Sequence, residues 1–341
     1  MTGDLLDLLD PHGLAEQADR RAAIAKAVGV VMDSVGRDNT KLAFKADWAT
    51  WESFCAHTGG TVIPTEVSED ALVLYALWLA RGEGTYTDGT PRKPSAPETI
   101  RRRITGVLAG WRARGTPPPG RTGAKARQVT DEYHRRLVEA DLPTGRGRAP
   151  ALTVPHARQI AATTPPTISG YRDLALVLIA FAIAGRRDEV AHLLLSDIET
   201  EQGGLYVNVR YSKTKPRRPA VLTWQNGATC PVRAWKRWKE ASRIIAGTAF
   251  RRIDRHGNIL GAMSGEAVGA VITRAGRRAG IELHLTGHSA RSGLATAARQ
   301  AGHDVTTIAQ QGGWDPNGAA LHRYLRIVDQ WTDNALAGIG L

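Results

Sequence analysis

Hydrophobic residues in the first half of the chain repeat at the spacing of amphipathic helices. In NTKLAFKADWATWESFCAHTG (39–59), five apolar side chains fall close to one stripe that repeats about every 3.6 residues, namely Leu42, Phe44, Trp48, Trp51 and Cys55. The segment VSEDALVLYALWLARGEG has a similar pattern, with Ser68 placed as its N-cap and a glycine placed to end it. We therefore expect two consecutive helices here.

Two further helices complete this half. In SAPETIRRRITGVLAGWRARG, Ser95 and Glu98 fit an S-x-x-E capping box, and Gly115 is placed to end the helix. The fourth helical pattern lies in AKARQVTDEYHRRLVEADL. Four helices in about 105 residues predict a compact all-α domain.

The pattern changes after PTGRGRAP (143–150), whose Pro, Gly and Arg residues predict an exposed linker. Helices are expected at about 153–163 and 169–185. The segment GGLYVNVRYSKTKPRRPAVLTW then alternates like two short strands around a basic turn. Further helices are expected from CPVRAWKRWKEAS, from SGEAVGAVITRAGRRAG, from TGHSARSGL and around LHRYL.

The predicted fold class is therefore mostly α. We expect a four- to five-helix N-terminal domain and a mixed, mainly helical second domain that holds a small antiparallel sheet. The predicted boundaries are an N-terminal extension (1–35), the helical domain (36–142), the linker (143–152) and the second domain (153–341).

Charge adds a prediction about partners. Lys and Arg number 45 against 33 Asp and Glu, so the formal net charge is +12, and the isoelectric point is near 10.1. Such an excess favours a polyanionic partner, with nucleic acid first and a membrane surface second. A solvated basic face without any partner is the alternative.

Other features narrow the class of protein. Cys55 and Cys230 lie far apart and form no C-x-x-C, which is typical of a reducing compartment and gives no zinc site. The acidic N-terminal stretch lacks the basic and apolar regions of a secretion signal. The most apolar run, 174–185, is too short to span a bilayer and predicts a buried helix. We expect a cytoplasmic protein without membrane attachment.

Four separated features suggest chemistry only when they are taken together. Singly, each has an ordinary explanation: a surface ion pair in AGRRDEVAHL, an exposed loop lysine in YSKTKP, a chance H-x-x-R in TGHSARSGL and packing aromatics in GGWDPNGAALHRYL. The residues concerned are Arg186, Glu189, Lys213, His288, Arg291, Trp314 and Tyr324.

As a set, these residue types suit phosphodiester chemistry. Two guanidiniums can neutralise the extra charge on the non-bridging oxygens without a metal. A tyrosine hydroxyl, whose pKa is normally near 10, becomes a usable nucleophile when arginines favour its phenolate and a histidine accepts or shares its proton. A lysine can protonate the 5′-oxygen leaving group. The product, a 3′-phosphotyrosyl link, keeps the bond energy, so religation needs no ATP. The chain has no P-loop, no zinc spacing and no obvious two-metal carboxylate cluster.

The order R-x-x-E, hairpin Lys, H-x-x-R, Trp, Tyr resembles the tyrosine recombinase (phage integrase) family. The resemblance covers roughly residues 38–341. It is greatest to the Cre recombinases, above all in GHSARSGLATAARQAGHDVTTIAQQGGW and in ETIRRRITGVLAGWRARGTPPP. It implies a DNA breaking–rejoining fold and a site-specific DNA recombinase that uses no metal or other cofactor.

The resemblance also implies a role for each residue of the set. Arg186 and Arg291 would clamp the scissile phosphate, with Glu189 supporting Arg186. Tyr324 would be the nucleophile, and His288 the proton acceptor or a phosphate ligand.

Two further residues complete the implied catalytic set. Lys213 would be the general acid, although Lys215 stays an alternative within the same turn. Trp314 stands where many family members have a second histidine, and its indole N–H can donate to a phosphate oxygen but cannot accept a proton.

The implied partner is double-stranded DNA with inverted-repeat sites, in or near a bacterial nucleoid, with the gene of bacterial, phage or plasmid origin. Four subunits would hold two sites and exchange strands through a Holliday junction. The C-terminal tail, with Trp331, Leu336 and Ile339, would dock into a neighbouring subunit; packing on its own domain is the alternative. Candidate DNA contacts, for which a solvated basic face is the alternative, are Lys41, Lys45, Arg101, Arg102 and Arg103.

Two other functions compete with this interpretation. A type IB topoisomerase shares the Arg/Lys/His/Tyr chemistry but relaxes supercoils as a monomer. A DNA-binding protein could keep the fold without catalysis. The four-helix domain and the terminal tail disfavour the first, and the complete set of seven residues disfavours the second.

Overall fold

The computed structural model describes residues 38–332 except 87, 146 and 224–226, with side chains described between Leu42 and Leu325. The predicted extension (1–35), Leu336 and Ile339 lie outside the described residues, as do the side chains of Lys41 and Trp331. The chain divides into two compact units, Met1–Gly147 and Arg148–Leu341.

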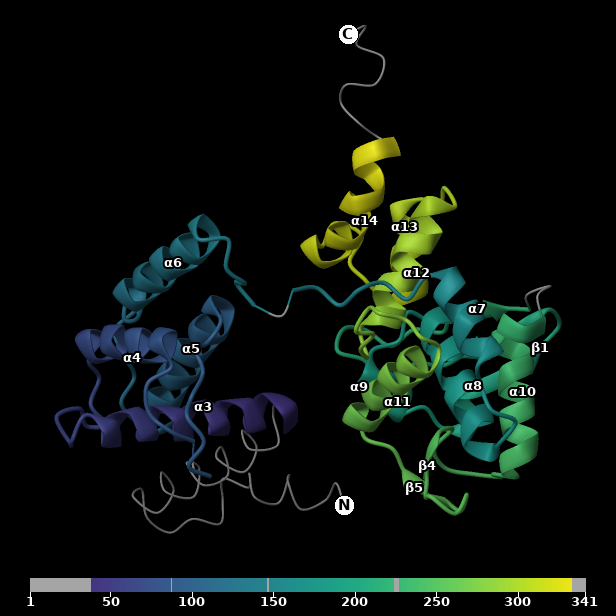
Figure 1. The fold of residues 1–341 in the computed structure, drawn as a ribbon, viewed down its shortest axis with the longest axis horizontal. Coiled ribbons are helices and arrows are strands. Elements are labelled where there is room, and N and C mark those ends of the chain that lie inside the picture. Colours follow the sequence, from purple (N-terminus) through teal and green to yellow (C-terminus); the bar gives the residue numbers. More distant parts are fainter. Residues whose placement is uncertain (1–37, 87, 146, 224–226, 333–341) are drawn as a thin grey trace, which may run out of the picture. The chain divides into compact units, whose positions relative to one another are not determined.

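The described part of the N-terminal unit has four helices (Figure 1): α3 (Asp38–His57), α4 (Glu69–Arg81), α5 (Pro97–Ala113) and α6 (Ala124–Glu139). They pack around a cluster of aromatic rings. Trp51 lies at the centre, with its ring edge-on to those of Tyr75 and Trp111. The indole N–H groups of Trp51 and Trp111 both donate to the carbonyl of Pro64, at 3.0 and 2.8 Å. One loop carbonyl therefore joins two helices through the core.

The predicted stripe on the first helix is correct only in part. Trp48, Trp51 and Cys55 are buried, whereas Leu42 is 63% exposed and Phe44 is also exposed. At about 100° per residue, Leu42 lies roughly 120° around the helix from Trp48, outside the buried face. The spacing identified the helix but extended its buried face too far towards the N-terminus.

The predicted helix caps are also correct only in part. Ser68 accepts a hydrogen bond from the amide of Ala71, and Gly82 ends α4 with a left-handed φ of 69°, so both predictions are confirmed. The capping box at Ser95 is wrong, because α5 begins at Pro97 with Ala96 as N-cap. Proline suits the first helical position, since its φ is already helical and it needs no hydrogen-bond acceptor there.

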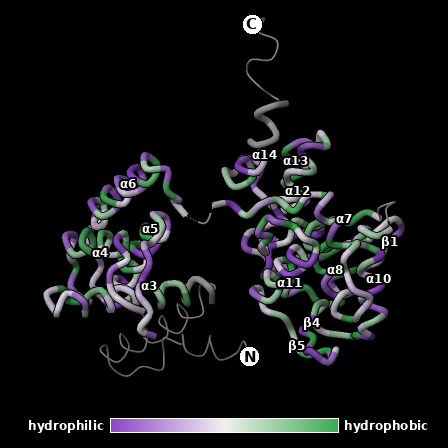
Figure 2. Tube along the Cα trace, in the orientation of Figure 1, coloured by the Kyte–Doolittle hydropathy of each residue, from purple (hydrophilic) through white to green (hydrophobic). Residues whose placement is uncertain are grey.

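The second unit is built around the buried helix α8 (Ile168–Ala182), whose apolar residues are coloured green in Figure 2. The helices packed with it include α7 (Val154–Ala162), α10 (Pro231–Ser242), α11 (Gly265–Arg278) and α12 (Ser289–Gln300), and the short α9 (Arg187–Ala191) follows it in the chain. A three-stranded antiparallel sheet has the order β1 (Ile198–Glu201), β2 (Gly204–Val207), β3 (Ala220–Leu222). Short 3-10 turns occupy Leu195–Asp197 and Gly227–Thr229.

Several elements of this unit were not anticipated. They are strand β1, strands β4 (Arg251–Ile253) and β5 (Ile259–Ala262), which pair as a hairpin, helix α9 and helix α13 (Val305–Gly312). Helix α13, α12 and α14 (Ala319–Thr332) enclose a small second core around Ile308, Leu321 and Leu325 (Figure 1). Trp314 and Tyr324 pack at the edge of that core.

The predicted fold class, mostly α with small antiparallel sheets, is confirmed. Within the part of the chain that the structure describes, no helix combines the length and apolar character that a membrane crossing requires. The apolar run of the sequence instead forms the interior of α8.

Trp111→Ala should destabilise the N-terminal unit because it empties a fully buried site and removes one of two donors to Pro64. We expect a loss of about 3–5 kcal/mol in free energy of unfolding. Denaturant-dependent hydrogen exchange of residues 38–139 in the full chain measures it. Leu74→Ala, at a residue 52% exposed on α4, is the control and should stay within about 0.5 kcal/mol of wild type. Equal losses would contradict the central role of the aromatic cluster.

Candidate active site

Arg186 and Glu189 form the first part of the site, where α8 gives way to α9. The connection turns through Ala184, which has a left-handed φ of 47°. Arg186 is the N-cap of α9, and its amide donates to Glu189 Oε2 at 3.0 Å while its guanidinium donates to Oε1 at 2.5 Å. The three-residue spacing thus produces an ion pair, but a buried one, since Glu189 is 2% exposed.

Glu189 has two further partners that come from the hairpin segment 208–219. Arg217 donates to Oε2 at 2.8 Å, and the hydroxyl of Ser212 donates to Oε1 at 2.9 Å. Burial alone would raise the pKa of Glu189, but the hydrogen bond and charge of Arg217, together with Arg186, lower it to about 2. The carboxylate is therefore ionised at every physiological pH.

Arg217 was not predicted as a site residue. Its side chain is 8% exposed, and it also donates to the carbonyl of Ile183 at 3.1 Å. The residues that it contacts are distant from it in the sequence. The only local sign of a role was therefore that Arg217 is one of several basic residues in this turn.

Arg291 lies on the first turn of α12 and is 3% exposed. Its Nη1 donates to the carbonyls of Ala184 and Gly312, at 2.7 and 2.6 Å, and its guanidinium stacks 3.7 Å from the ring centre of Trp314. Burial and the charge of Arg186 lower the pKa of Arg291 to about 9. Its Nη2 is buried and has no hydrogen-bond partner among the described residues, so the group is oriented but not neutralised.

His288 and Tyr324 line one small cavity of about 230 Å³, together with Arg148, Ala149, Ala320 and Arg323. His288 is the N-cap of α12 and is exposed, yet the protein packed around its ring lowers its pKa, as do the charges of Arg187, Arg291 and Arg186. A neutral imidazole is therefore favoured beside the tyrosine. Arg148, whose Nη1 donates to the carbonyl of Arg323 at 3.1 Å, was not predicted here.

Trp314 connects the tyrosine to the arginines. Its ring lies edge-on to that of Tyr324, with centroids 6.0 Å apart at 63°, and covers the guanidinium of Arg291. The structure thus brings Arg186, Glu189, Arg291, Trp314 and Tyr324 into one connected group, with His288 sharing the tyrosine cavity.

Lys213 and Lys215 are both exposed on the turn between β2 and β3, so the choice between them stays a prediction. Lys213 follows Ser212, which is bonded to Glu189, and precedes Thr214, whose hydroxyl donates to the carbonyl of Gly313 at 3.3 Å. The residues on both sides of Lys213 are therefore tied to the site through their side chains.

The candidate DNA contacts of the N-terminal unit already have protein partners. Arg101 pairs with Asp131 and Glu98, Arg102 with Asp47, and Arg103 bonds to Ser95 at the limit of hydrogen-bond distance. Lys45 is exposed on α3. Arginines at consecutive helical positions face different directions, as expected.

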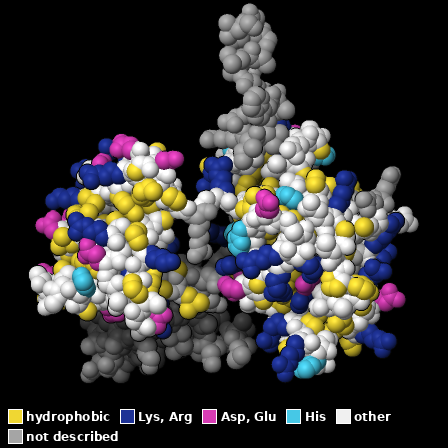
Figure 3. Space-filling view, in the orientation of Figure 1, with side chains coloured by type: hydrophobic (Ala, Val, Ile, Leu, Met, Phe, Trp, Pro, Cys, Tyr) yellow, Lys and Arg dark blue, Asp and Glu magenta, His cyan; other side chains and the backbone are white. Residues whose placement is uncertain are grey.

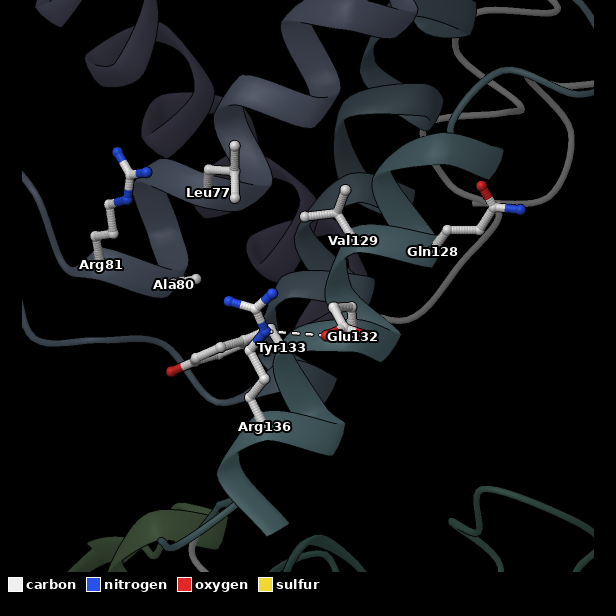
Figure 4. A pocket seen from close by; sticks show the side chains of 8 residues that line it. All are labelled: Leu77, Ala80, Arg81, Gln128, Val129, Glu132, Tyr133 and Arg136. Atoms are coloured by element: carbon white, nitrogen blue, oxygen red, sulfur yellow. Dashed lines mark hydrogen bonds and ion pairs between the residues drawn. The ribbon is translucent and has the colours of Figure 1, made fainter. Parts of the chain in front are cut away.

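The N-terminal unit has a groove of about 530 Å³ between α4 and α6 (Figure 4). Its lining mixes apolar side chains with an Arg136–Glu132 ion pair of 2.9 Å. None of the candidate residues lines it, and we assign it no role.

Basic side chains clearly outnumber acidic ones on the visible face of the second unit (Figure 3). Part of the net positive charge of the chain therefore lies on this face of the unit that holds the tyrosine.

Similarity to known proteins shows to which family the chain belongs. The model of the phage integrase family matches residues 151–330, more than half of the chain. The chain belongs to the phage integrase family. It is 28% identical over 310 residues to an integrase/recombinase xerD homolog of Selenomonas ruminantium, covering 88% of this chain and 84% of that relative.

Solved structures agree with this family assignment at the level of the fold. A Tn1549 transposon integrase in complex with transposon right end DNA matches with a TM-score of 0.56 and 13% identity, covering 88% of this chain and 92% of that one. A second structure of that integrase, in complex with a circular intermediate DNA, gives a TM-score of 0.54 with 14% identity, covering 87% and 92%.

His288 should titrate below its ordinary value of 6.5. Because the unfolded chain then binds the proton more tightly, the stability contributed by neutral His288 is present above about pH 6.5 and falls below it. Arg187→Gln should raise the pKa of His288, since Arg187 is the largest charge acting on it. Ring-proton NMR titration of the full chain measures the shift. Arg252→Gln, at an exposed position on β4, is the control; an unchanged titration in Arg187→Gln would contradict this assignment.

Proposed function

We propose that this member of the phage integrase family is a site-specific DNA recombinase that cleaves one strand through a covalent 3′-phosphotyrosyl link to Tyr324. The observation that carries the proposal is the connected group around Tyr324. Two arginines held by buried contacts, a tyrosine and a histidine meet on α9, α12 and α14. This is the set that phosphodiester transfer to a tyrosine requires.

The arginines are arranged to accept an anion. Arg186, Arg217 and Arg291 surround one carboxylate, so two positive charges are left uncompensated within the group. A phosphate would supply the missing charge and a partner for the buried Nη2 of Arg291. In the transition state the non-bridging oxygens gain charge, so the same contacts become stronger as the reaction proceeds.

Proton transfer follows from the remaining residues. The Tyr324 oxygen attacks phosphorus, and neutral His288 either takes the phenolic proton or holds the phosphate; both roles stay open. As the bond from phosphorus to the 5′-oxygen breaks, Lys213 protonates the leaving oxygen. The new ester keeps the phosphodiester energy, so this scheme involves neither ATP nor a metal. Religation is the reverse attack by a 5′-hydroxyl.

We assign DNA binding outside the active site to the helical domain, predicted at 36–142. Its basic residues on α3 and α5 include Lys45, Arg101 and Arg102. Because both arginines are paired with carboxylates, DNA phosphates must compete with Asp47 and Asp131 for them. Their contribution to affinity is therefore smaller than their number suggests.

Assembly into a tetramer is proposed through the C-terminal tail. The second unit has an apolar groove of about 410 Å³ between α8, β3, α12 and α13, lined by Phe181, Leu222, Leu294, Ala298, Ala301 and Ile308 among others. The sequence 333–341, DNALAGIGL, carries Leu336 and Ile339 at the end of the chain. The groove offers an apolar site for such a tail from a neighbouring subunit.

The resemblance to Cre recombinases rests partly on Trp314, whereas the relative reported above is a xerD homolog. Our proposal concerns the recombinase activity, acting on DNA inside the cell, and it leaves the subgroup open. A type IB topoisomerase and a catalytically silent DNA-binding protein remain its two rivals.

Tyr324→Phe should reduce covalent attachment to DNA to background, because it removes only the attacking hydroxyl. The substrates are nicked duplexes from the DNA flanking the gene, chosen for inverted repeats of about 13 base pairs around a short spacer. Adducts that survive denaturing electrophoresis are counted. Tyr206→Phe, at an exposed position on β2, is the matched control and should react like wild type.

Each rival predicts a different outcome of the same assay. Adduct formation by Tyr324→Phe would show that the nucleophile is a different residue. Efficient relaxation of a plasmid that lacks the site would favour a topoisomerase. Binding without any adduct would favour the silent protein.

Ala301→Arg should weaken assembly on DNA because it places a charge in the apolar groove, and removal of residues 333–341 should have the same effect. Sedimentation of the protein with two-site DNA measures the subunit number. Gln300→Arg, which adds the same charge one residue away from the groove lining, is the control. Unchanged assembly in both altered proteins would contradict docking at this groove.

A further inference from the structure

Arg217 has a buried, charged side chain within the site. The proposed cleavage reaction gives this residue no role. It lies opposite Val209 across the base of the Lys213 turn, with both backbone hydrogen bonds made, at 2.8 and 3.2 Å. Its Nη2 reaches across to Glu189 and to the carbonyl of Ile183. The side chain therefore connects the hairpin to the start of the segment that carries Arg186.

The two arms of the turn are held in different ways. The outgoing arm is fixed by an Arg210–Asp197 ion pair at 2.6 Å, and by the ring of Tyr211, which stacks 4.0 Å from that of His192. At its end Ser212 donates to Glu189.

The returning arm is held by the side chain of Arg217, which forms a buried ion pair with Glu189. Ser212 and Arg217 thus grip the two oxygens of one carboxylate from either side of the four-residue tip 213–216. The position of Lys213 depends on both.

Arg217 also packs beneath the segment before Trp314. Gly313 has a left-handed φ of 63°, and a Cβ on it would come within 2.8 Å of Arg217 Cδ. Thr214 of the same tip donates to the Gly313 carbonyl. Trp314 in turn covers Arg291. The tip 213–216 and one of the arginines proposed to bind the phosphate are therefore both linked to Arg217 through the segment before Trp314.

We propose that Arg217 is a positioning residue for the general acid: by binding Glu189 it holds the Lys213 tip at a set place relative to Arg186. This rests on the proposed strand cleavage by Tyr324. Arg217 is not proposed to touch DNA. Its Nη2 is bonded to Glu189 and to the carbonyl of Ile183, and its Nε and Nη1, which have no hydrogen-bond partner among the described residues, are buried against Gly313.

A sulfur-substituted substrate separates this role from phosphate binding. When the 5′-bridging oxygen of the scissile phosphate is replaced by sulfur, the leaving group is a thiol whose pKa is near 8.5, so it departs without a proton donor. A variant that fails only to deliver the proton should therefore cleave the sulfur substrate at close to the wild-type rate. A variant with impaired phosphate binding, or with a damaged fold, should cleave both substrates slowly.

The experiment measures single-turnover cleavage of two duplexes that carry the site found with Tyr324→Phe, one with oxygen and one with sulfur. Arg217→Ala is compared with Lys213→Ala, which marks the loss of the acid itself. Arg217→Lys tests rescue by a shorter cation. Arg218→Ala is the matched control, because Arg218 is the next residue and its side chain contacts only exposed groups, the carboxylate of Glu199 and the ring of Tyr206.

We expect Arg217→Ala to slow cleavage of the oxygen substrate by about 100-fold and that of the sulfur substrate by less than about threefold, as for Lys213→Ala. Arg217→Lys should recover part of the rate, and Arg218→Ala should match wild type on both. If removal of Arg217 unfolds the second unit, Ser212→Ala should show the same selectivity with a smaller loss, since it breaks only one of the two contacts.

Three outcomes would overturn the inference: equal losses on both substrates, no loss on either, or a Lys213→Ala defect that sulfur does not relieve. Failure of the proposed function is distinct, because wild-type protein would then form no adduct with either duplex.

Discussion

A carboxylate removed from water is stable only when its charge and its lone pairs are satisfied. Glu189 meets this condition with two arginines, a serine hydroxyl and the backbone amide of Arg186. These partners come from the end of α8 and from the β2–β3 hairpin, so one buried charge fixes how the two segments lie together. The rest of the site is assembled around that contact.

Arg291 extends the same arrangement to α12 and α13. Its bonds to the carbonyls of Ala184 and Gly312 hold it between the end of α8 and the end of α13, and Trp314 closes over it. The backbone at Ala184 adopts a conformation that is unfavourable for a residue with a Cβ, and its carbonyl accepts one of these bonds. Strain and excess positive charge therefore occur together beside the tyrosine, as expected of a site built to receive an anion.

The two units satisfy their arginines differently. In the N-terminal unit two of the three consecutive arginines of α5, Arg101 and Arg102, pair with carboxylates, and Arg103 bonds to the neutral hydroxyl of Ser95. In the second unit Arg186 and Arg217 share one acid, Glu189, and the charge of Arg291 lies close enough to act on all three. We therefore expect the stronger attraction for a phosphate where the chemistry is proposed, whereas DNA phosphates at Arg101 and Arg102 would have to compete with internal ion pairs.

Much of the fold and part of the site could be predicted from sequence, because they depend on contacts between near neighbours. Helical periodicity located α4, α8, α10 and α11, and the Ser68 cap was recognisable from local chemistry. Spacings of three residues placed Arg186 beside Glu189 and set His288 and Arg291 on one helix start.

Tertiary structure decided what those local signals could not. Leu42 has the right residue type but lies outside the buried face of α3. Strands β1, β4 and β5 are only three or four residues long, and unlike β2 and β3 they were not recognisable as parts of a longer alternating segment around a basic turn. Arg217 is a site residue only because the hairpin folds back onto Glu189, 28 positions away. The sequence by itself therefore determined the helices and the chemical set, whereas long-range packing of a buried charge decided which arginines complete it.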